Sequence, residues 1–62
     1  MMKKPKGKKV LVLLIDDDKT WYEAEVKSLL SVQFTADVDV KGEKNIRMFY
    51  MYRDFNLTWK EI

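Results

Sequence analysis

The chain contains neither cysteine nor histidine among its 62 residues. Without cysteine it can form no disulfide bond and offers no thiolate for catalysis, and without both residues it lacks the usual zinc ligands. It also has no Gly-rich phosphate loop and no nucleophile elbow. Carboxylate-only calcium or magnesium sites stay open in principle, but Asp16, Asp17 and Asp18 are consecutive and favour a solvated turn, because neighbouring strand residues point to opposite faces. We predict a non-catalytic domain without a metal or other cofactor.

Long hydrophobic runs are also missing. The longest apolar run is Val10 to Ile15, which is far too short to span a bilayer. The basic N-terminus is not followed by the apolar stretch and small-residue cleavage site of a signal peptide. We therefore expect no membrane partner, and a location in the cytosol or nucleus.

What the sequence does contain is a high share of apolar and charged residues. The hydrophobic fraction of 47% and aromatic fraction of 13% are typical of one packed domain. The net charge is only +2, but residues 1–9 hold five lysines and no acidic residue, while the remaining seven Lys and Arg face ten Asp and Glu. This asymmetry predicts a flexible basic arm at 1–9 and a folded domain at 10–62.

Hydrophobic periodicity predicts a series of short strands. Residues Val32 to Val40 alternate strictly between apolar and polar, with Val32, Phe34, Ala36 and Val38 on the face expected to be buried. Residues Thr20 to Ser31 fit both a helix and a strand, and the flanking strands favour a strand. The other predicted segments are a strand buried on both faces at Val10 to Ile15, a turn at Asp16 to Lys19, a loop at Lys41 to Asn45, an aromatic strand at Ile46 to Arg53, a break at Asp54 to Asn56 and a last strand or helix start at Leu57 to Ile62. This spacing predicts an all-β fold: a small SH3-like or Tudor-like barrel of about five antiparallel strands, with or without a short C-terminal helical turn.

The aromatic residues carry the strongest functional signal. Five of the eight fall within eleven residues, from Phe49 to Trp59. A core this small cannot easily bury them all, and aromatic rings that converge at a surface can bind a methylated ammonium group by cation–π attraction. For any single ring, packing in the core is the competing interpretation.

The C-terminal pattern resembles the chromo barrel family, which includes MRG proteins, an MSL-complex subunit and the N-terminal domains of MYST acetyltransferases. The matching segment runs from Phe49 to Glu61: an aromatic strand ending in tyrosine, two residues, an aromatic residue followed by asparagine, then a tryptophan and an acidic step. Residues 7–11 and 21–26 resemble the family's opening glycine and its first two strands. Leu14 stands near the position where members often carry a further aromatic residue or histidine, and Ile62 stands where tryptophan is usual.

The resemblance implies a nuclear reader of methylated lysine on a histone tail, working within a chromatin-modifying complex. By position, the cage aromatics would be Tyr22, Tyr52, Phe55 and Trp59, with support from Trp21, Asp54 and Asn56. The arm lysines are candidates for contact with nucleosomal DNA or RNA, with a solubilising tail as the alternative: Lys3, Lys4, Lys6, Lys8 and Lys9. Two other functions stay open, namely a nucleic-acid-binding barrel without a competent cage and a protein-interaction barrel whose aromatics all lie in the core.

Overall fold

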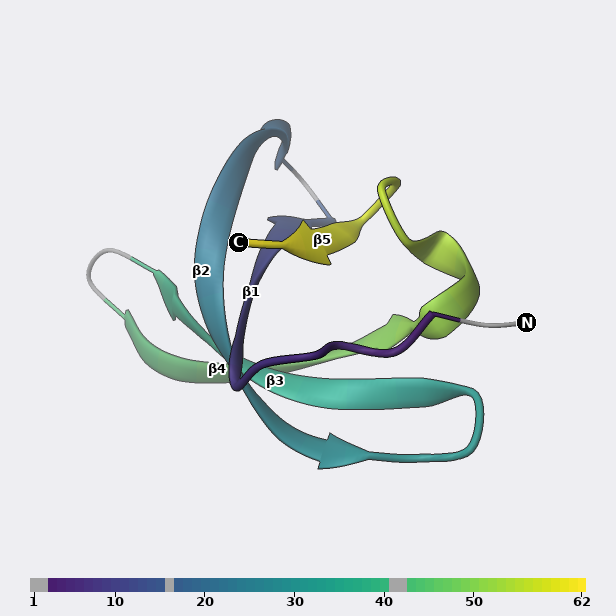
Figure 1. Ribbon diagram of the computed structural model, residues 1–62. Coiled ribbons are helices and arrows are strands. Elements are labelled where there is room, and N and C mark those ends of the chain that lie inside the picture. Colours follow the sequence, from purple (N-terminus) through teal and green to yellow (C-terminus); the bar gives the residue numbers. More distant parts are fainter. Residues whose placement is uncertain (1–2, 16, 41–42) are drawn as a thin grey trace.

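Five antiparallel strands and one 3-10 turn make up the described part of the chain (Figure 1). The structure is a computed structural model that describes residues 3–15, 17–40 and 43–62, without the side chains of residues 17–18 and 43–45. The elements are β1 (Lys9–Leu14), β2 (Asp17–Leu29), β3 (Gln33–Val40), β4 (Glu43–Met51), the turn η1 (Tyr52–Asp54) and β5 (Trp59–Glu61). The predicted all-β fold of five antiparallel strands is confirmed, and the described residues contain no α-helix.

The strands form one curled sheet in the order β4-β3-β2-β1-β5. The 13-residue β2 is long enough to pair with β1 along its first part and with β3 along its last part. Register shifts interrupt the β1–β2, β2–β3 and β3–β4 pairings, and such irregularities bend strands and increase their twist. The last strand returns to β1, where Trp59 pairs with Val12, so the sheet wraps around one core.

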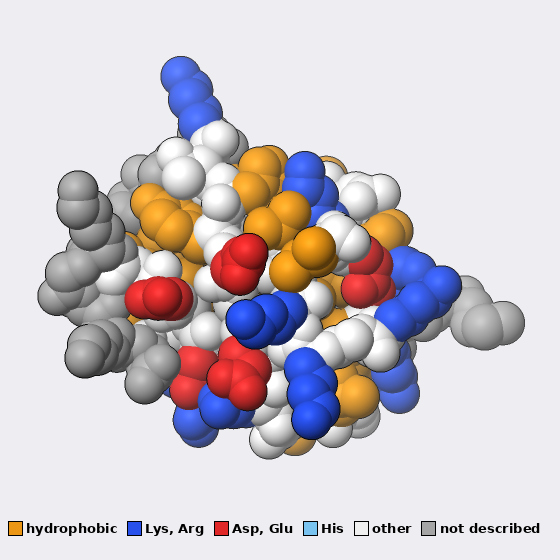
Figure 2. Space-filling view, turned by 60° about the vertical axis from the view of Figure 1, so that its left-hand side comes forward, with side chains coloured by type: hydrophobic (Ala, Val, Ile, Leu, Met, Phe, Trp, Pro, Cys, Tyr) orange, Lys and Arg blue, Asp and Glu red, His pale blue; other side chains and the backbone are white. Residues whose placement is uncertain are grey.

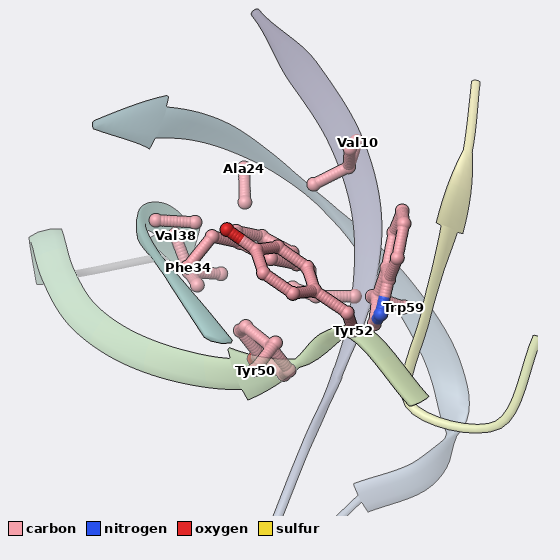
Figure 3. Packing of buried hydrophobic residues seen from close by; sticks show 9 residues of the cluster. Val10, Ala24, Phe34, Val38, Tyr50, Tyr52 and Trp59 are labelled. Carbon is pink, nitrogen blue, oxygen red and sulfur yellow. The ribbon is translucent and has the colours of Figure 1, made fainter. Parts of the chain in front are cut away.

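Alternation along each strand selects the core residues. In β3 the inward side chains Phe34, Ala36 and Val38 are fully buried. Strands on either side add Val10, Val12, Ala24 and Tyr50, and the C-terminal segment adds Tyr52 and Trp59 (Figure 3). Phe34 lies at the centre, with its ring centroid 5.0 Å from that of Trp59 and 5.8 Å from that of Tyr50. The aromatic rings of the core therefore gather around Phe34.

Several predicted boundaries differ from the observed ones. Val32 lies before β3 and is 47% exposed, so it does not join the buried face of that strand. The run at Val10 to Ile15 is not buried on both faces. Val10 and Val12 are fully buried, but Leu11 and Leu13 between and after them are partly exposed, and Ile15 is 95% exposed at the turn. The predicted turn and loop are each shorter than expected, since β2 already begins at Asp17 and β4 at Glu43; Asp16, Lys41 and Gly42 lie outside the described residues. The aromatic strand ends at Met51, because Tyr52 and Arg53 belong to the 3-10 turn.

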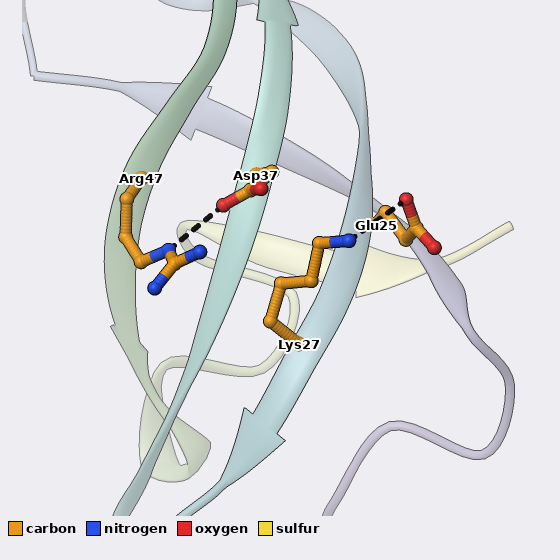
Figure 4. A network of polar contacts seen from close by, with 4 residues as sticks. All are labelled: Glu25, Lys27, Asp37 and Arg47. Carbon is orange, nitrogen blue, oxygen red and sulfur yellow. Dashed lines mark hydrogen bonds and ion pairs between the residues drawn. The ribbon is translucent and has the colours of Figure 1, made fainter.

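Charged pairs lie on the outer face of the central strands. Asp37 of β3 accepts a hydrogen bond of 2.9 Å from Arg47 of β4, and Lys27 lies 3.3 Å from Glu25 on β2 (Figure 4). The hydrogen bond from Arg47 to Asp37, together with their charge attraction, raises the pKa of the guanidinium. In Figure 2 acidic and basic side chains are interspersed across the face in view. Exposed ion pairs of this kind contribute little to stability, so we assign them no structural or functional role beyond keeping this face in contact with water. Within the described residues no helix is long and apolar enough to cross a membrane.

Candidate functional site

The 3-10 turn gathers three of the four predicted cage residues around the end of β4. Tyr52 opens the turn, and Phe55 follows it and forms an isolated bridge with Trp59. The ring centroids of Phe55 and Trp59 are 5.0 Å apart, and Phe34 contacts both Trp59 and Tyr52. The three predicted residues therefore belong to one connected aromatic cluster, with Phe34 as the shared neighbour that the sequence did not single out for the site.

Trp59 is the largest fully buried member of the cluster. Its side chain is fully buried, the indole N–H donates a 3.0 Å hydrogen bond to the carbonyl of Met51, and its ring meets that of Phe34 edge to face. The expectation of an exposed ring at this position needs correction. The last strand must cover the open end of the core, and the largest apolar side chain of β5 does so with its one polar atom satisfied.

Tyr52 is also fully buried, with its hydroxyl donating a 2.6 Å hydrogen bond to the carbonyl of Leu30. Its ring stacks on Phe34 at a centroid distance of 6.0 Å and an angle of 19°. The ammonium of Lys4 lies over the same ring, 5.4 Å from its centroid. The expectation of an open ring differs from the structure here too, because the core takes one side of Tyr52 and the arm supplies a cation over it.

Phe55, like Tyr22, is only partly buried. It packs against the core through Trp59, and the ammonium of Lys3 lies 5.1 Å from its ring centroid. Two consecutive arm lysines thus lie over Tyr52 and Phe55. Cations at these distances over aromatic faces are attracted by the ring quadrupole.

Tyr22, the fourth predicted cage residue, lies in β2. It is partly buried against the core and pairs with Val12, which in turn pairs with Trp59. Two strand spacings therefore separate Tyr22 from Trp59, which amounts to roughly 9–10 Å of backbone distance. The buried Val12 lies between these two residues in the sheet, and Tyr22 packs against the same core.

The three predicted supporting residues have separate environments. Trp21 follows the opposite parity to Tyr22, so it faces outward, where the ammonium of Lys60 lies 4.2 Å from its ring centroid. The Asp54 carbonyl accepts hydrogen bonds from the backbone N–H groups of Leu57 and Thr58 and so shapes the turn. Asn56 has a φ of 68° and donates its N–H to the Trp59 carbonyl at 2.7 Å. Asparagine tolerates this left-handed conformation better than most residues do.

The arm itself lies against the domain rather than apart from it. Pro5 is buried, the backbone N–H of Lys6 lies 3.1 Å from a Glu61 carboxylate oxygen, and the Lys8 carbonyl accepts a 2.7 Å hydrogen bond from Val26. Lys9 already belongs to β1. Of the five lysines predicted to bind nucleic acid, Lys3 is partly buried and the other four are exposed. The ammonium groups of Lys3 and Lys4 lie over the two rings, whereas Lys6, Lys8 and Lys9 have no such ring contact among the described residues.

A second surface feature lies near the end of β4. A pocket of about 380 Å³ between the ends of β1 and β4 and the final turn is lined mostly by apolar side chains, among them Leu13, Phe49 and Leu57. Phe49 and Leu57 are well exposed there. At its wall the Tyr50 hydroxyl donates to the Leu13 carbonyl at 2.9 Å, and burial raises the pKa of this tyrosine to about 12. Sequence reasoning did not anticipate this pocket, because it forms between segments far apart in the chain.

The burial of Pro5 and the hydrogen bond from Lys6 to Glu61 were also missed. A lone proline within a lysine-rich segment could have indicated a fixed conformation, but nothing in the sequence links Lys6 to Glu61 near the other end. Comparisons with protein-family models, with curated proteins and with solved structures gave no match to this chain.

Proposed function

We propose that this domain is a non-catalytic recognition module that binds a lysine side chain of a partner peptide over the rings of Tyr52 and Phe55. The observation that carries the proposal is the position of Lys3 and Lys4, whose ammonium groups lie 5.1 and 5.4 Å from the centroids of those rings. A surface that accepts lysine from its own chain has the chemistry to accept lysine from another.

Methylated lysine is the favoured form of the ligand. Methyl groups spread the ammonium charge and lower the cost of removing it from water, so the same rings gain more from contact. Each well-placed ring would contribute about 0.5–2 kcal/mol. The resemblance of residues 49–61 to chromo barrel domains extends the proposal to a methylated histone tail, a chromatin-modifying complex and the nucleus.

Titration with three matched peptides tests the proposal. The peptides carry trimethyl-lysine, unmodified lysine or the uncharged acetyl-lysine at one position, and binding is followed by changes in the ring proton signals of Tyr52 and Phe55. We expect affinity to fall in that order. Equal binding of the acetyl-lysine peptide would contradict recognition of a cation.

A pair of phenylalanine variants locates the binding surface. Phe55→Ala should abolish the preference for the methylated peptide, whereas Phe49→Ala should keep it, because Phe49 is 59% exposed on the pocket side of β4. Thermal melting of both variants separates a loss of binding from a loss of folding.

A second candidate function is binding to DNA or RNA through Lys6, Lys8 and Lys9, which are exposed in one short segment. Three phosphate contacts would give a log–log salt slope of about −2.7 on duplex DNA. Replacing all three by glutamine should flatten this slope, and binding that is unchanged in the variant would remove this candidate.

A further inference from the structure

The arm and the proposed ligand would use the same surface. Figure 1 shows the N-terminal segment crossing the front of the sheet and ending beside the 3-10 turn. Its first described residue, Lys3, lies over Phe55, and Lys4 lies over Tyr52. A lysine from a partner could not approach the outer sides of these rings while both arm lysines remain there.

The arm is held at more points than its two cations. Pro5 is buried directly after them, the backbone N–H of Lys6 donates to Glu61, and the Lys8 carbonyl accepts a hydrogen bond from Val26. The buried proline is an apolar anchor, and its ring fixes φ, which reduces the conformational freedom that the arm loses on docking. The backbone bends at residues 6–8, between the part of the arm that crosses the sheet and the start of β1.

Each of these contacts is weak, but the arm that makes them belongs to the same chain as the rings. Lys4 is exposed, so its attraction to Tyr52 is screened by water. A tethered ligand nevertheless acts at an effective concentration in the millimolar range. A free peptide at lower concentration must therefore bind the rings more tightly than the arm does in order to displace it. A few weak contacts are thus enough to keep the surface mostly covered.

We propose that Lys3-Lys4-Pro5 is a built-in competitor: it occupies the ring surface in cis, and a partner peptide binds only when the arm leaves. This inference rests on the proposed function, and it also describes the ligand. The preferred partner presents adjacent lysines followed by an apolar residue in an extended segment, as the arm does.

The test compares the full chain with two charge-matched double variants. Lys3→Gln/Lys4→Gln removes the two cations over the rings, and Lys8→Gln/Lys9→Gln removes the same charge from exposed positions. The ring proton signals of Tyr52 and Phe55 report docking of the arm, and fluorescence anisotropy reports binding of a labelled trimethyl-lysine peptide. We expect the ring signals to shift in the first variant alone, and its affinity to rise about 3- to 10-fold, the gain when a docked fraction of roughly 70–90% is released.

The outcomes separate this inference from the proposed function. Ring signals that do not respond to Lys3→Gln/Lys4→Gln would overturn arm docking, and ring signals that respond without a gain in affinity would overturn competition. If the rings respond but none of the three proteins binds the peptide, the proposed function fails, and competition fails with it. The arm would then be a structural strap.

Discussion

The aromatic core around Phe34 and the ring surface under the arm are neighbouring regions held by different interactions. In the core, Tyr52 and Trp59 direct their polar atoms to main-chain carbonyls, and their rings contact other rings. At the surface, Phe55 packs on Trp59 through one side and receives a lysine over its ring. The difference shows that aromatic type does not decide the role of a residue. What decides it is which side of the ring the fold has already covered.

The two tryptophans offer the strongest test of this contrast. Trp59→Ala should lower the free energy of unfolding by about 3–5 kcal/mol, because it opens a cavity in the core and removes the hydrogen bond to Met51. Trp21→Ala should cost about 0.5–1 kcal/mol, since this ring faces outward and loses mainly its contact with Lys60. Denaturant unfolding measures both values. Similar losses for the two variants would break the distinction between core and surface rings.

A smaller effect concerns the hydroxyl of Tyr50, which belongs to the core region but lies at the pocket wall. Its pKa is raised to about 12 in the folded state, against about 10 when unfolded. Below pH 10 both states keep the proton. Between pH 10 and 12 the unfolded state loses it first, so stability should fall as the pH rises, by about 1–3 kcal/mol in total. Tyr50→Phe should show a shallower fall over this range in pH-dependent denaturation, and identical curves for the two proteins would contradict the effect.

The smallest effect concerns the turn that joins the two regions. Asn56 adopts a φ of 68° between Phe55 and Trp59. Replacement by alanine should cost about 1 kcal/mol, because a Cβ without a local hydrogen-bonding group disfavours this conformation, whereas glycine should change stability by less than about 0.5 kcal/mol. Thermal melting of the pair decides the point. Alanine as stable as glycine would mean that the turn relaxes to another conformation.

The strands were predictable from the sequence where one face alone is buried. The alternation in β3 identified Phe34, Ala36 and Val38 correctly, because each residue's side follows from its parity. The same rule predicted that Val32 is buried, which is wrong, because β3 begins only at Gln33 and Val32 lies outside it. It also failed beyond Met51, since a 3-10 turn and a left-handed residue replace the two-residue repeat there.

The candidate site was only partly predictable for the same reason. The sequence brought Tyr52, Phe55 and Trp59 together through their spacing, but which rings are covered depends on contacts with distant segments. Tyr52 is tied to Leu30, 22 residues away, and Lys6 approaches Glu61, 55 residues away. Hydrophobic periodicity predicts which face of a strand is buried, but it does not predict contacts between distant segments. It therefore could not show that the arm lies over the rings.

The pairing of β5 with β1 has a consequence for how the chain folds. Strands β1 to β4 are joined as successive hairpins, whereas β5 must find β1 from almost the whole length of the chain away, as the neighbouring purple and yellow strands of Figure 1 show. Closing so long a loop costs chain entropy before any contact forms, and non-local pairing of this kind slows folding. We therefore expect a transition state in which the hairpins are largely formed and Trp59 is still in water. Substitutions at Trp59 would then speed unfolding while leaving the folding rate almost unchanged.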